Sequence, residues 1–143
     1  MFSTTCEYAL RALVGLARVP DGDAILGRDL ARRAAIPANY LSKILLTLRN
    51  AGVLTTARGT GGGYRLRKPP ETIRLMDIVV LFDGARAMPS CLLGGKTCSD
   101  EDPCPAHESW RDIRAAYVEF LESTTLASIA QSDRRGDLTP RDS

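Results

Sequence analysis

The sequence predicts a mostly helical chain that carries one small β-hairpin. Apolar residues recur at three- and four-residue spacing in several segments, which is the pattern of amphipathic helices. Near the middle, two short β-rich stretches flank a run of glycines, which is the pattern of a hairpin. The length of 143 residues, with 44% hydrophobic and 25% charged residues, is typical of one ordinary globular domain.

The N-terminal third predicts three helices, two of them joined by a tight turn. The first spans residues 5–19, and a short second helix spans residues 29–35 and ends before Ile36-Pro37. Asn39 is expected to cap the third helix, which ends at Ala51-Gly52. Helices two and three therefore form a helix-turn-helix unit. The apolar faces contain Ala9, Leu10, Leu13, Leu30, Ala34, Leu41, Ile44, Leu45 and Leu48.

The hairpin is expected directly after these helices. Strands at residues 53–56 and 64–67 flank Arg58-Gly59-Thr60-Gly61-Gly62-Gly63. This order is that of a winged helix-turn-helix, in which the second helix of the unit enters the major groove of DNA. We therefore expect binding to a double-stranded DNA operator. The candidate DNA-binding residues are Arg28, Arg33, Ala38, Asn39, Tyr40, Ser42, Lys43, Arg49, Arg58, Thr60, Gly61 and Arg65.

The distribution of charge fits this expectation. Residues 1–70 contain eleven Lys and Arg against four Asp and Glu (11 − 4 = +7), residues 71–143 contain eight against thirteen (8 − 13 = −5), and the sum is +2. Only the first half suits a polyanion. Two alternatives stay open: the basic residues can be a solvated surface, and the glycine run can be a turn without a partner. The glycine run lacks the spacing of a phosphate-binding loop.

The second half predicts two more helices. One covers residues 73–82, a loop covers residues 84–103, and a long helix covers residues 105–128. One face of the long helix is apolar and predicts core packing or contact between subunits. That face contains Trp110, Ile113, Tyr117, Phe120, Leu121 and Thr124.

Three cysteines and the single histidine lie close together in the sequence. Cys91, Cys98 and Cys104 lie within fourteen residues, and His107 follows three positions later. Three thiolates and an imidazole form a metal-ligand set. The wide gaps, without any C-x-x-C pair, favour an iron–sulfur cluster over a single zinc ion without excluding zinc. A catalytic cysteine needs a base and an orienting group, so we expect neither an enzyme nor a small-molecule substrate.

These features together resemble a known family. The matching motifs are Tyr40-Leu41, Leu48-Arg49-Asn50-Ala51-Gly52-Val53-Leu54 and Arg58-Gly59-Thr60-Gly61-Gly62-Gly63-Tyr64-Arg65-Leu66. They resemble the recognition helix and wing of the Rrf-type bacterial transcription regulators, the IscR/NsrR group, over about residues 2–128. The resemblance implies a homodimer whose DNA affinity depends on an iron–sulfur cluster held by Cys91, Cys98 and Cys104. The cluster would sense redox state, nitric oxide or cluster and iron status.

The resemblance leaves the fourth ligand open. His107 matches the position used in the IscR-like branch, and Glu7 matches the carboxylate that the NsrR-like branch presents from helix one of the partner subunit. Each has an alternative role. Thr4-x-x-Glu7 matches a capping box, and His107 can cap or pack in the first turn of its helix. Cys6 has no counterpart and is expected to be a small buried hydrophobe.

Two departures from the family pattern concern the cluster and the operator. Six residues separate Cys91 from Cys98 where five are commoner, and Ser42 stands where many members have Glu. Both two-iron and four-iron clusters are compatible with three cysteines and one other ligand, and we expect the two-iron form. The alternative is a winged-helix regulator whose cysteines bind zinc or stay as thiols and which acts through a protein partner.

The predicted organisation has four parts. Residues 1–83 form the winged helix-turn-helix domain, 84–107 a cysteine-rich cluster-binding loop, 105–130 a dimerisation helix and 131–143 a flexible tail. The longest run without a charged residue, 123–132, is too short to span a bilayer, so we expect no membrane association. Residues 1–18 lack the order of a secretory signal, and a cytoplasmic location is expected.

Overall fold

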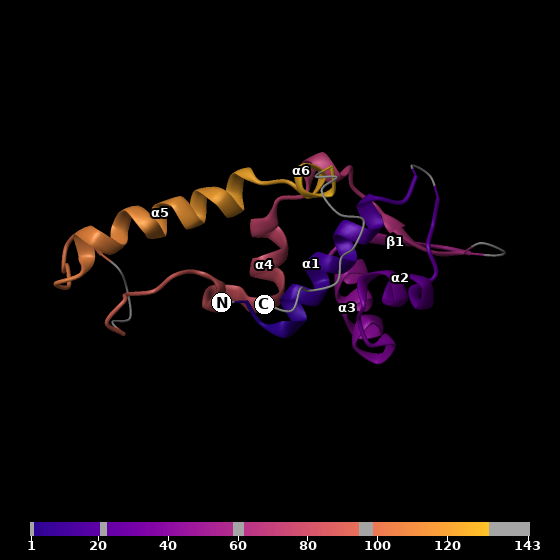
Figure 1. Ribbon diagram of the computed structural model, residues 1–143, viewed down its shortest axis with the longest axis horizontal. Coiled ribbons are helices and arrows are strands. Elements are labelled where there is room, and N and C mark those ends of the chain that lie inside the picture. Colours follow the sequence, from indigo (N-terminus) through magenta and orange to yellow (C-terminus); the bar gives the residue numbers. More distant parts are fainter. Residues whose placement is uncertain (1, 21–22, 59–61, 95–98, 132–143) are drawn as a thin grey trace.

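The protein is mostly helical with one two-stranded antiparallel sheet, as the sequence predicts (Figure 1). The computed structural model describes residues 2–20, 23–58, 62–94 and 99–131. Across those ranges no helix has the length and apolar character needed to cross a membrane. The elements are α1 Thr4–Ala17, α2 Gly27–Ala34, α3 Ala38–Asn50, β1 Leu54–Ala57, β2 Gly63–Leu66, η1 Pro70–Thr72, α4 Leu75–Asp83, η2 Gly84–Ala87, α5 His107–Ser123 and α6 Leu126–Ala130.

Helix α1 begins at a serine cap. The Ser3 hydroxyl accepts a hydrogen bond from the Cys6 amide at 3.1 Å, which satisfies one of the free amides of the first turn. The predicted capping box of Thr4 and Glu7 is therefore wrong, because Ser3, one residue earlier, already occupies the cap position. Glu7 keeps an exposed side chain in the first turn of the helix.

Helix α3 begins without a side-chain cap. Pro37 stands at the cap position, so the predicted cap Asn39 is wrong and lies inside the helix with an exposed side chain. The turn between α2 and α3 is closed by the main chain instead. Ala35 adopts a left-handed conformation, and the Ile36 amide donates to the Ala31 carbonyl at 2.9 Å. Burial of Ile36, 5% exposed, fixes the turn against the core.

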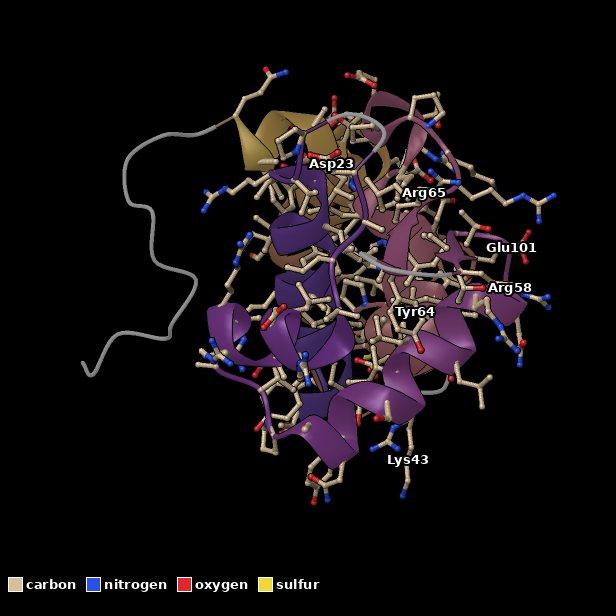
Figure 2. All side chains as sticks on the ribbon, turned by 90° about the vertical axis from the view of Figure 1, so that its right-hand side faces the viewer. Asp23, Lys43, Arg58, Tyr64, Arg65 and Glu101 are labelled. Carbon is tan, nitrogen blue, oxygen red and sulfur yellow. The ribbon has the colours of Figure 1, made fainter. Side chains whose placement is uncertain are left out.

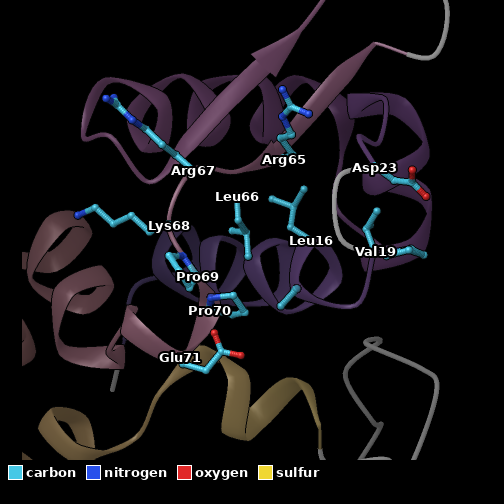
Figure 3. Close-up of a pocket in the computed structure, with 12 residues that line it drawn as sticks. Leu16, Val19, Asp23, Arg65, Leu66, Arg67, Lys68, Pro69, Pro70 and Glu71 are labelled. Carbon is cyan, nitrogen blue, oxygen red and sulfur yellow. The ribbon is translucent and has the colours of Figure 1, made fainter.

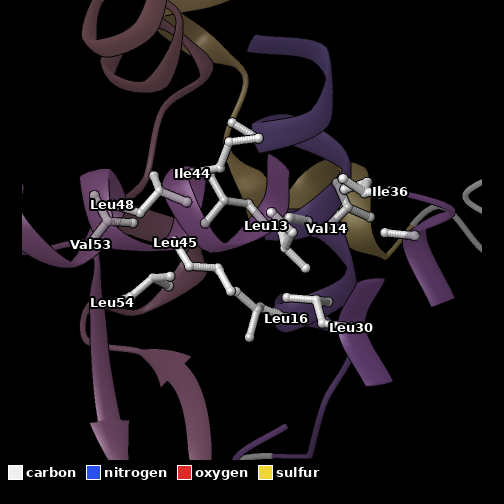
Figure 4. Packing of buried hydrophobic residues seen from close by; sticks show 14 of the residues in the cluster. Leu13, Val14, Leu16, Leu30, Ile36, Ile44, Leu45, Leu48, Val53 and Leu54 are labelled. Carbon is white, nitrogen blue, oxygen red and sulfur yellow. The ribbon is translucent and has the colours of Figure 1, made fainter. Parts of the chain in front are cut away.

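The main core lies between α1, α2 and α3 (Figure 4). Leu13 of α1, Leu30 of α2 and Leu48 of α3 are fully buried there. The hairpin closes one side through Leu54, and Leu126 of α6 joins the same cluster from the C-terminal part. Each such leucine contributes about 1.5–3 kcal/mol by leaving water. Helix α3 is therefore held rigidly on α1.

The hairpin is anchored to the segment before α2. Its strands pair Leu54 with Leu66 and Ala57 with Gly63. Tyr64 of β2 also pairs with Ile25, which lies outside the hairpin, and the two residues exchange two main-chain hydrogen bonds, at 3.0 and 2.8 Å. Gly63 lies at this crossing with φ +138°, where a side chain is strained. The loop end of strand β2 is thus fixed to the helix-turn-helix unit.

The predicted long helix over residues 105–128 is wrong at its C-terminal end. Helix α5 ends at Ser123, Thr124 and Thr125 are extended, and α6 starts at Leu126. The extended residues pair with the strand-like segment before α4: Leu75 donates to the Thr124 carbonyl at 3.0 Å, and Leu126 donates to the Ile73 carbonyl at 2.8 Å. Two consecutive β-branched residues favour this break.

We predict that Gly63→Ala weakens the fold where the loop end of β2 crosses Ile25. A Cβ atom at this position would lie 2.2 Å from the Ile25 carbonyl oxygen. The free energy of unfolding should fall by more than about 1 kcal/mol, because both the clash and the φ angle oppose the substitution. Urea unfolding followed by circular dichroism measures this change.

Gly27→Ala is the matched control. Its Cβ would meet Leu45 and Tyr64 at 3.7 Å, an ordinary contact, at the first position of α2. That variant should unfold at or above the urea concentration of the wild type. Equal midpoints for the two variants would show that the crossing does not hold the hairpin.

Candidate DNA interface and cysteine loop

Helix α3 presents a polar stripe opposite its buried face. Leu41, Ile44, Leu45 and Leu48 face the core, whereas the side chains of Asn39 and Lys43 are exposed. Since residues four apart lie one above the other on a helix, these two project together. An exposed polar stripe on the second helix of a helix-turn-helix has the shape and chemistry that enter the major groove.

Two hydroxyls beside the stripe are engaged by the helix itself. Ser42 donates to the Ala38 carbonyl at 3.0 Å, and Thr47 donates to the Lys43 carbonyl at 3.1 Å. The Ser42 hydroxyl, a predicted DNA-binding group, therefore has its acceptor lone pairs, and not its proton, available for another partner. Ala38, the remaining candidate in this turn, is exposed at the start of the helix.

Tyr40 joins the recognition helix to α1. Its ring is 55% exposed and meets the ring of Tyr8 edge-on, with 6.2 Å between centroids. The Arg11 guanidinium lies over the Tyr8 ring, 4.9 Å from its centroid. This stack connects the predicted DNA-binding side chain of Tyr40 to the first helix.

The predicted basic residues lie on the surface of α2, α3 and the hairpin. Arg28, Arg33, Arg49, Arg58 and Arg65 all have exposed side chains. We call β1, β2 and residues 58–62 between them the wing; Figure 2, seen from its tip, shows Lys43 and Arg58 pointing outward. Two predicted wing residues, Thr60 and Gly61, lie outside the described residues. The described cations surround α3 and suit a polyanion.

A pocket lies where the wing meets α1 (Figure 3). It measures about 370 Å³ and has an apolar floor that includes Leu16 and Leu66. Charges of both signs line its rim: Arg65, Arg67 and Lys68 on the β2 side, and Asp23 and Glu71 opposite. The three cations extend the basic surface from the wing toward η1.

The segment before Cys91 is held along α5. Three side chains of the helix donate to its carbonyl oxygens: Tyr117 to Ala87 at 2.8 Å, Arg114 to Pro89 at 3.0 Å and Trp110 to Ser90 at 2.8 Å. We call residues 88–106 the cysteine loop. Because the three bonds run antiparallel to α5, they bring Cys91 to the N-terminal end of that helix.

Three predicted ligands lie near this end of α5. Cys91 is 9% exposed, Cys104 is partly buried, and neither forms a disulfide bond. The main-chain carbonyl of Cys104 accepts a hydrogen bond from the His107 amide at 2.9 Å. His107 is 7% exposed at the first position of α5. Cys98 lies outside the described residues. Over the part of the chain that the structure describes, no three metal-binding side chains converge on one point.

An acidic residue that the sequence did not single out contacts His107. Oδ1 of Asp100 lies 2.7 Å from Nε2 of the imidazole. This hydrogen bond holds the pKa of the Asp100 carboxyl below its usual value. A histidine that binds a metal commonly donates its other ring nitrogen to a carboxylate. The contact is compatible with ligation through Nδ1.

A second link that the sequence did not predict ties α1 to the end of α4. The Ser3 amide donates to Asp83 Oδ2 at 2.8 Å, and the Ser3 hydroxyl donates to Asp83 Oδ1. Burial raises the pKa of the Asp83 carboxyl, but the hydrogen bonds from Ser3 lower it, and the pKa lies below its usual value. Ser3 before an apolar helix was a readable cap signal, but its pairing with a residue eighty positions away was not.

Cys6 is the small buried hydrophobe that the sequence suggested. It is fully buried beside Leu75, Val79 and Leu121. Burial first, and then the carboxylates of Asp83 and Glu7, raise the pKa of its thiol to about 12. Cys6 is therefore a thiol, and not a thiolate, at neutral pH.

Comparisons with known proteins place the chain in a family. The family model described as Rrf2, iron-dependent transcriptional regulator, matches residues 2–132. The chain belongs to the Rrf2 family. An HTH-type transcriptional regulator of Aquifex aeolicus is 31% identical over 137 residues, which are 94% of each chain. The resemblance noted from the sequence is thus confirmed, and the protein is a DNA-binding transcription regulator rather than an enzyme.

Solved structures of Rrf2 relatives share the fold. CymR, the global cysteine regulator of B. subtilis, is 32% identical with a TM-score of 0.76, over 91% of this chain and 95% of that one. T. potens IscR is 25% identical with a TM-score of 0.73, over 94% and 88%. An oxidized form of Staphylococcus aureus CymR is 30% identical with a TM-score of 0.71, over 92% and 96%.

We predict that Cys6 resists alkylation in the native protein. With a pKa of about 12, only about one thiol in ten thousand is ionised at pH 8, and the thiolate is the reactive form. Iodoacetamide should label Cys6 at least about 100-fold more slowly in the native than in the guanidinium-unfolded chain. Mass spectrometry of the Cys6 peptide measures both rates. Equal rates would contradict the burial and the raised pKa.

Proposed function

We propose that this Rrf2 regulator binds its operator as a homodimer under the control of an iron–sulfur cluster held by the cysteine loop. The observation that carries the proposal is the set of three hydrogen bonds from α5 to residues 87–90. They hold Cys91 at the end of α5 that also carries Cys104 and His107. Cysteines outside any disulfide, beside a buried imidazole, are suitable donors for such a cluster.

The ligands proposed are the thiolates of Cys91, Cys98 and Cys104. The fourth is His107 of the same chain or Glu7 of the partner subunit. Asp100 supports the first choice, because its carboxylate orients the imidazole and favours one tautomer. When bound, the cluster supplies sensitivity to oxygen, nitric oxide or redox change; the two-iron form is the one we propose.

A second copy of the chain is proposed to cover the apolar face of α5. Ile113 is 60% exposed and Phe120 is 54% exposed on that helix. Beside them lies an apolar groove of about 320 Å³, lined by Met88, Trp110, Tyr117 and neighbouring residues. Exposed apolar area of this kind on one helix is typical of subunit contact. Within one chain, the predicted apolar face of α5 is thus only partly buried, mainly at Leu121.

The DNA contacts are proposed from the surface described above. Helix α3 would enter the major groove, and Arg58 on the wing would reach a phosphate or the minor groove. Two-fold symmetry would place two such helices on half-sites about 34 Å apart. The full set proposed is Arg28, Arg33, Ala38, Asn39, Tyr40, Ser42, Lys43, Arg49, Arg58, Thr60, Gly61 and Arg65.

The cysteine loop can influence α3 through α1. Asp83, the last residue of α4, is separated from the loop only by η2 and is bonded to Ser3 at the start of α1. From there Tyr8 on the same helix contacts Tyr40 of α3. An ordered loop would fix Asp83 and with it the position of α1 relative to α5. This path lets events at the cysteines change the distance between two recognition helices.

Anaerobic purification followed by a visible spectrum and by counting iron and sulfide per chain tests the proposal. The wild type should be brown, with iron and sulfide in equal amounts. Cys104→Ala should lose both, because a missing thiolate cannot be replaced by alanine. His107→Ala and Glu7→Gln distinguish the two choices of fourth ligand, since only the ligand's variant should shift the spectrum.

Cys6→Ala is the matched control for loss of a cysteine. It removes a thiol of the packed core and should keep iron and sulfide at the wild-type level. Each variant should still sediment as a dimer, which excludes unfolding as the cause. A wild type that stays colourless after anaerobic reconstitution would contradict the cluster.

A second candidate function is favoured by the likeness to CymR. One of those relatives is a global cysteine regulator, and another was solved in an oxidized form. In this alternative the loop cysteines of the present chain are plain thiols or bind zinc, and regulation proceeds through a protein partner. A colourless dimer that still binds DNA would support it.

A further inference from the structure

One large apolar side chain lies in the middle of the polar stripe of α3. Leu46 follows Asn39 by seven residues and Lys43 by three, and it precedes Asn50 by four, so all four project from one face. That face is opposite the buried stripe of Leu41, Ile44, Leu45 and Leu48. Leu46 is 50% exposed and belongs to neither buried cluster. Packing within the chain therefore does not explain a leucine here.

The surroundings of Leu46 suit a nucleic acid better than an apolar protein surface. Lys43 and Arg49 on the same helix are exposed cations, and α2 and β1, which pack against α3, carry or lead to the exposed Arg28 and Arg58. The exposed apolar residues that suit a second copy lie elsewhere, on α5. The apolar contact of Leu46 must thus be made inside a positively charged surface, where a phosphate backbone approaches.

The major groove offers one apolar feature, the 5-methyl group of thymine. We infer that Leu46 contacts the 5-methyl group of a thymine in each operator half-site and so helps to set the DNA sequence that this protein selects. The inference rests on the proposed placement of α3 in the major groove. 5-Methylcytosine presents the same group at the same edge, and the experiment separates the two bases.

The side chains beside Leu46 explain why it can make this contact. Thr47 and Ser42, its neighbours on the flanks, direct their hydroxyl protons to carbonyls of α3. Asn39 and Lys43, on the same stripe, carry the free polar groups that pair with base edges or phosphates. Leu46 can then give the protein a preference for a methyl group at one base position, because no polar side chain competes for that contact.

The experiment begins with selection of duplexes from a random DNA pool by the anaerobically purified full-length protein. In the selected duplex each thymine is replaced in turn by deoxyuridine, which removes only the methyl group. Wild-type affinity should fall about three- to fivefold at one thymine per half-site, as expected for one buried methyl group. In Leu46→Ala the duplex with thymine and the duplex with deoxyuridine should bind equally. Cytosine and 5-methylcytosine at the same position are compared in the same way.

Thr47→Ala is the matched control on the same helix. It truncates the adjacent side chain and should keep the wild-type preference for thymine over deoxyuridine. The inference is overturned if no thymine methyl matters to the wild type, or if Leu46→Ala keeps the full preference. Preference for 5-methylcytosine over thymine would overturn the choice of base. Failure to enrich any sequence would instead contradict the proposed function, because a specific operator would then be missing.

Discussion

The burial of α1 on two sides is the constraint on which the rest of the structure depends. On one side Ala12, Leu13 and Leu16 pack into the cluster that holds α3 and the wing. At its N-terminal end Cys6 belongs to a second cluster with Val79 of α4 and Leu121 of α5. One rigid helix is therefore common to the DNA-binding surface and to the elements that frame the cysteine loop. Any displacement of α4 and α5 relative to α1 has to be accommodated by both clusters.

The polar contacts follow the same division. The hydrogen bonds from α5 to residues 87–90 hold the start of the cysteine loop, and the Ser3–Asp83 pair fastens the beginning of α1 to the end of α4. The basic residues lie at the other end of the molecule, where the wing projects away from α5 (Figure 1). The proposed sensing site and the candidate DNA-binding surface are thus separated in space but share α1. In the proposed function, this arrangement would allow the cysteines to affect DNA binding without contacting the DNA.

Short-range sequence patterns predict most of the fold, whereas contacts between residues far apart in the sequence cannot be predicted from those patterns. Periodic leucines and the glycine run located the helices and the hairpin, because burial of one face dictates that spacing. The end of the long helix was missed, since Thr124 and Thr125 leave the helix only to pair with the segment before α4. The caps at Asn39 and Thr4 were misassigned because the main chain and Ser3 already satisfy those helix ends. Asp100 gave no signal, as an acidic residue in a loop is ordinary until its histidine is placed beside it.

In the proposed function, the state of the cysteine loop controls DNA affinity. The most direct measurement compares the dissociation constants of the cluster-loaded and cluster-stripped protein for one selected duplex, at fixed salt, with sedimentation confirming dimers in both samples. We expect at least a tenfold difference, which corresponds to about 1.4 kcal/mol between the two states. Equal dissociation constants for two intact dimers would contradict it.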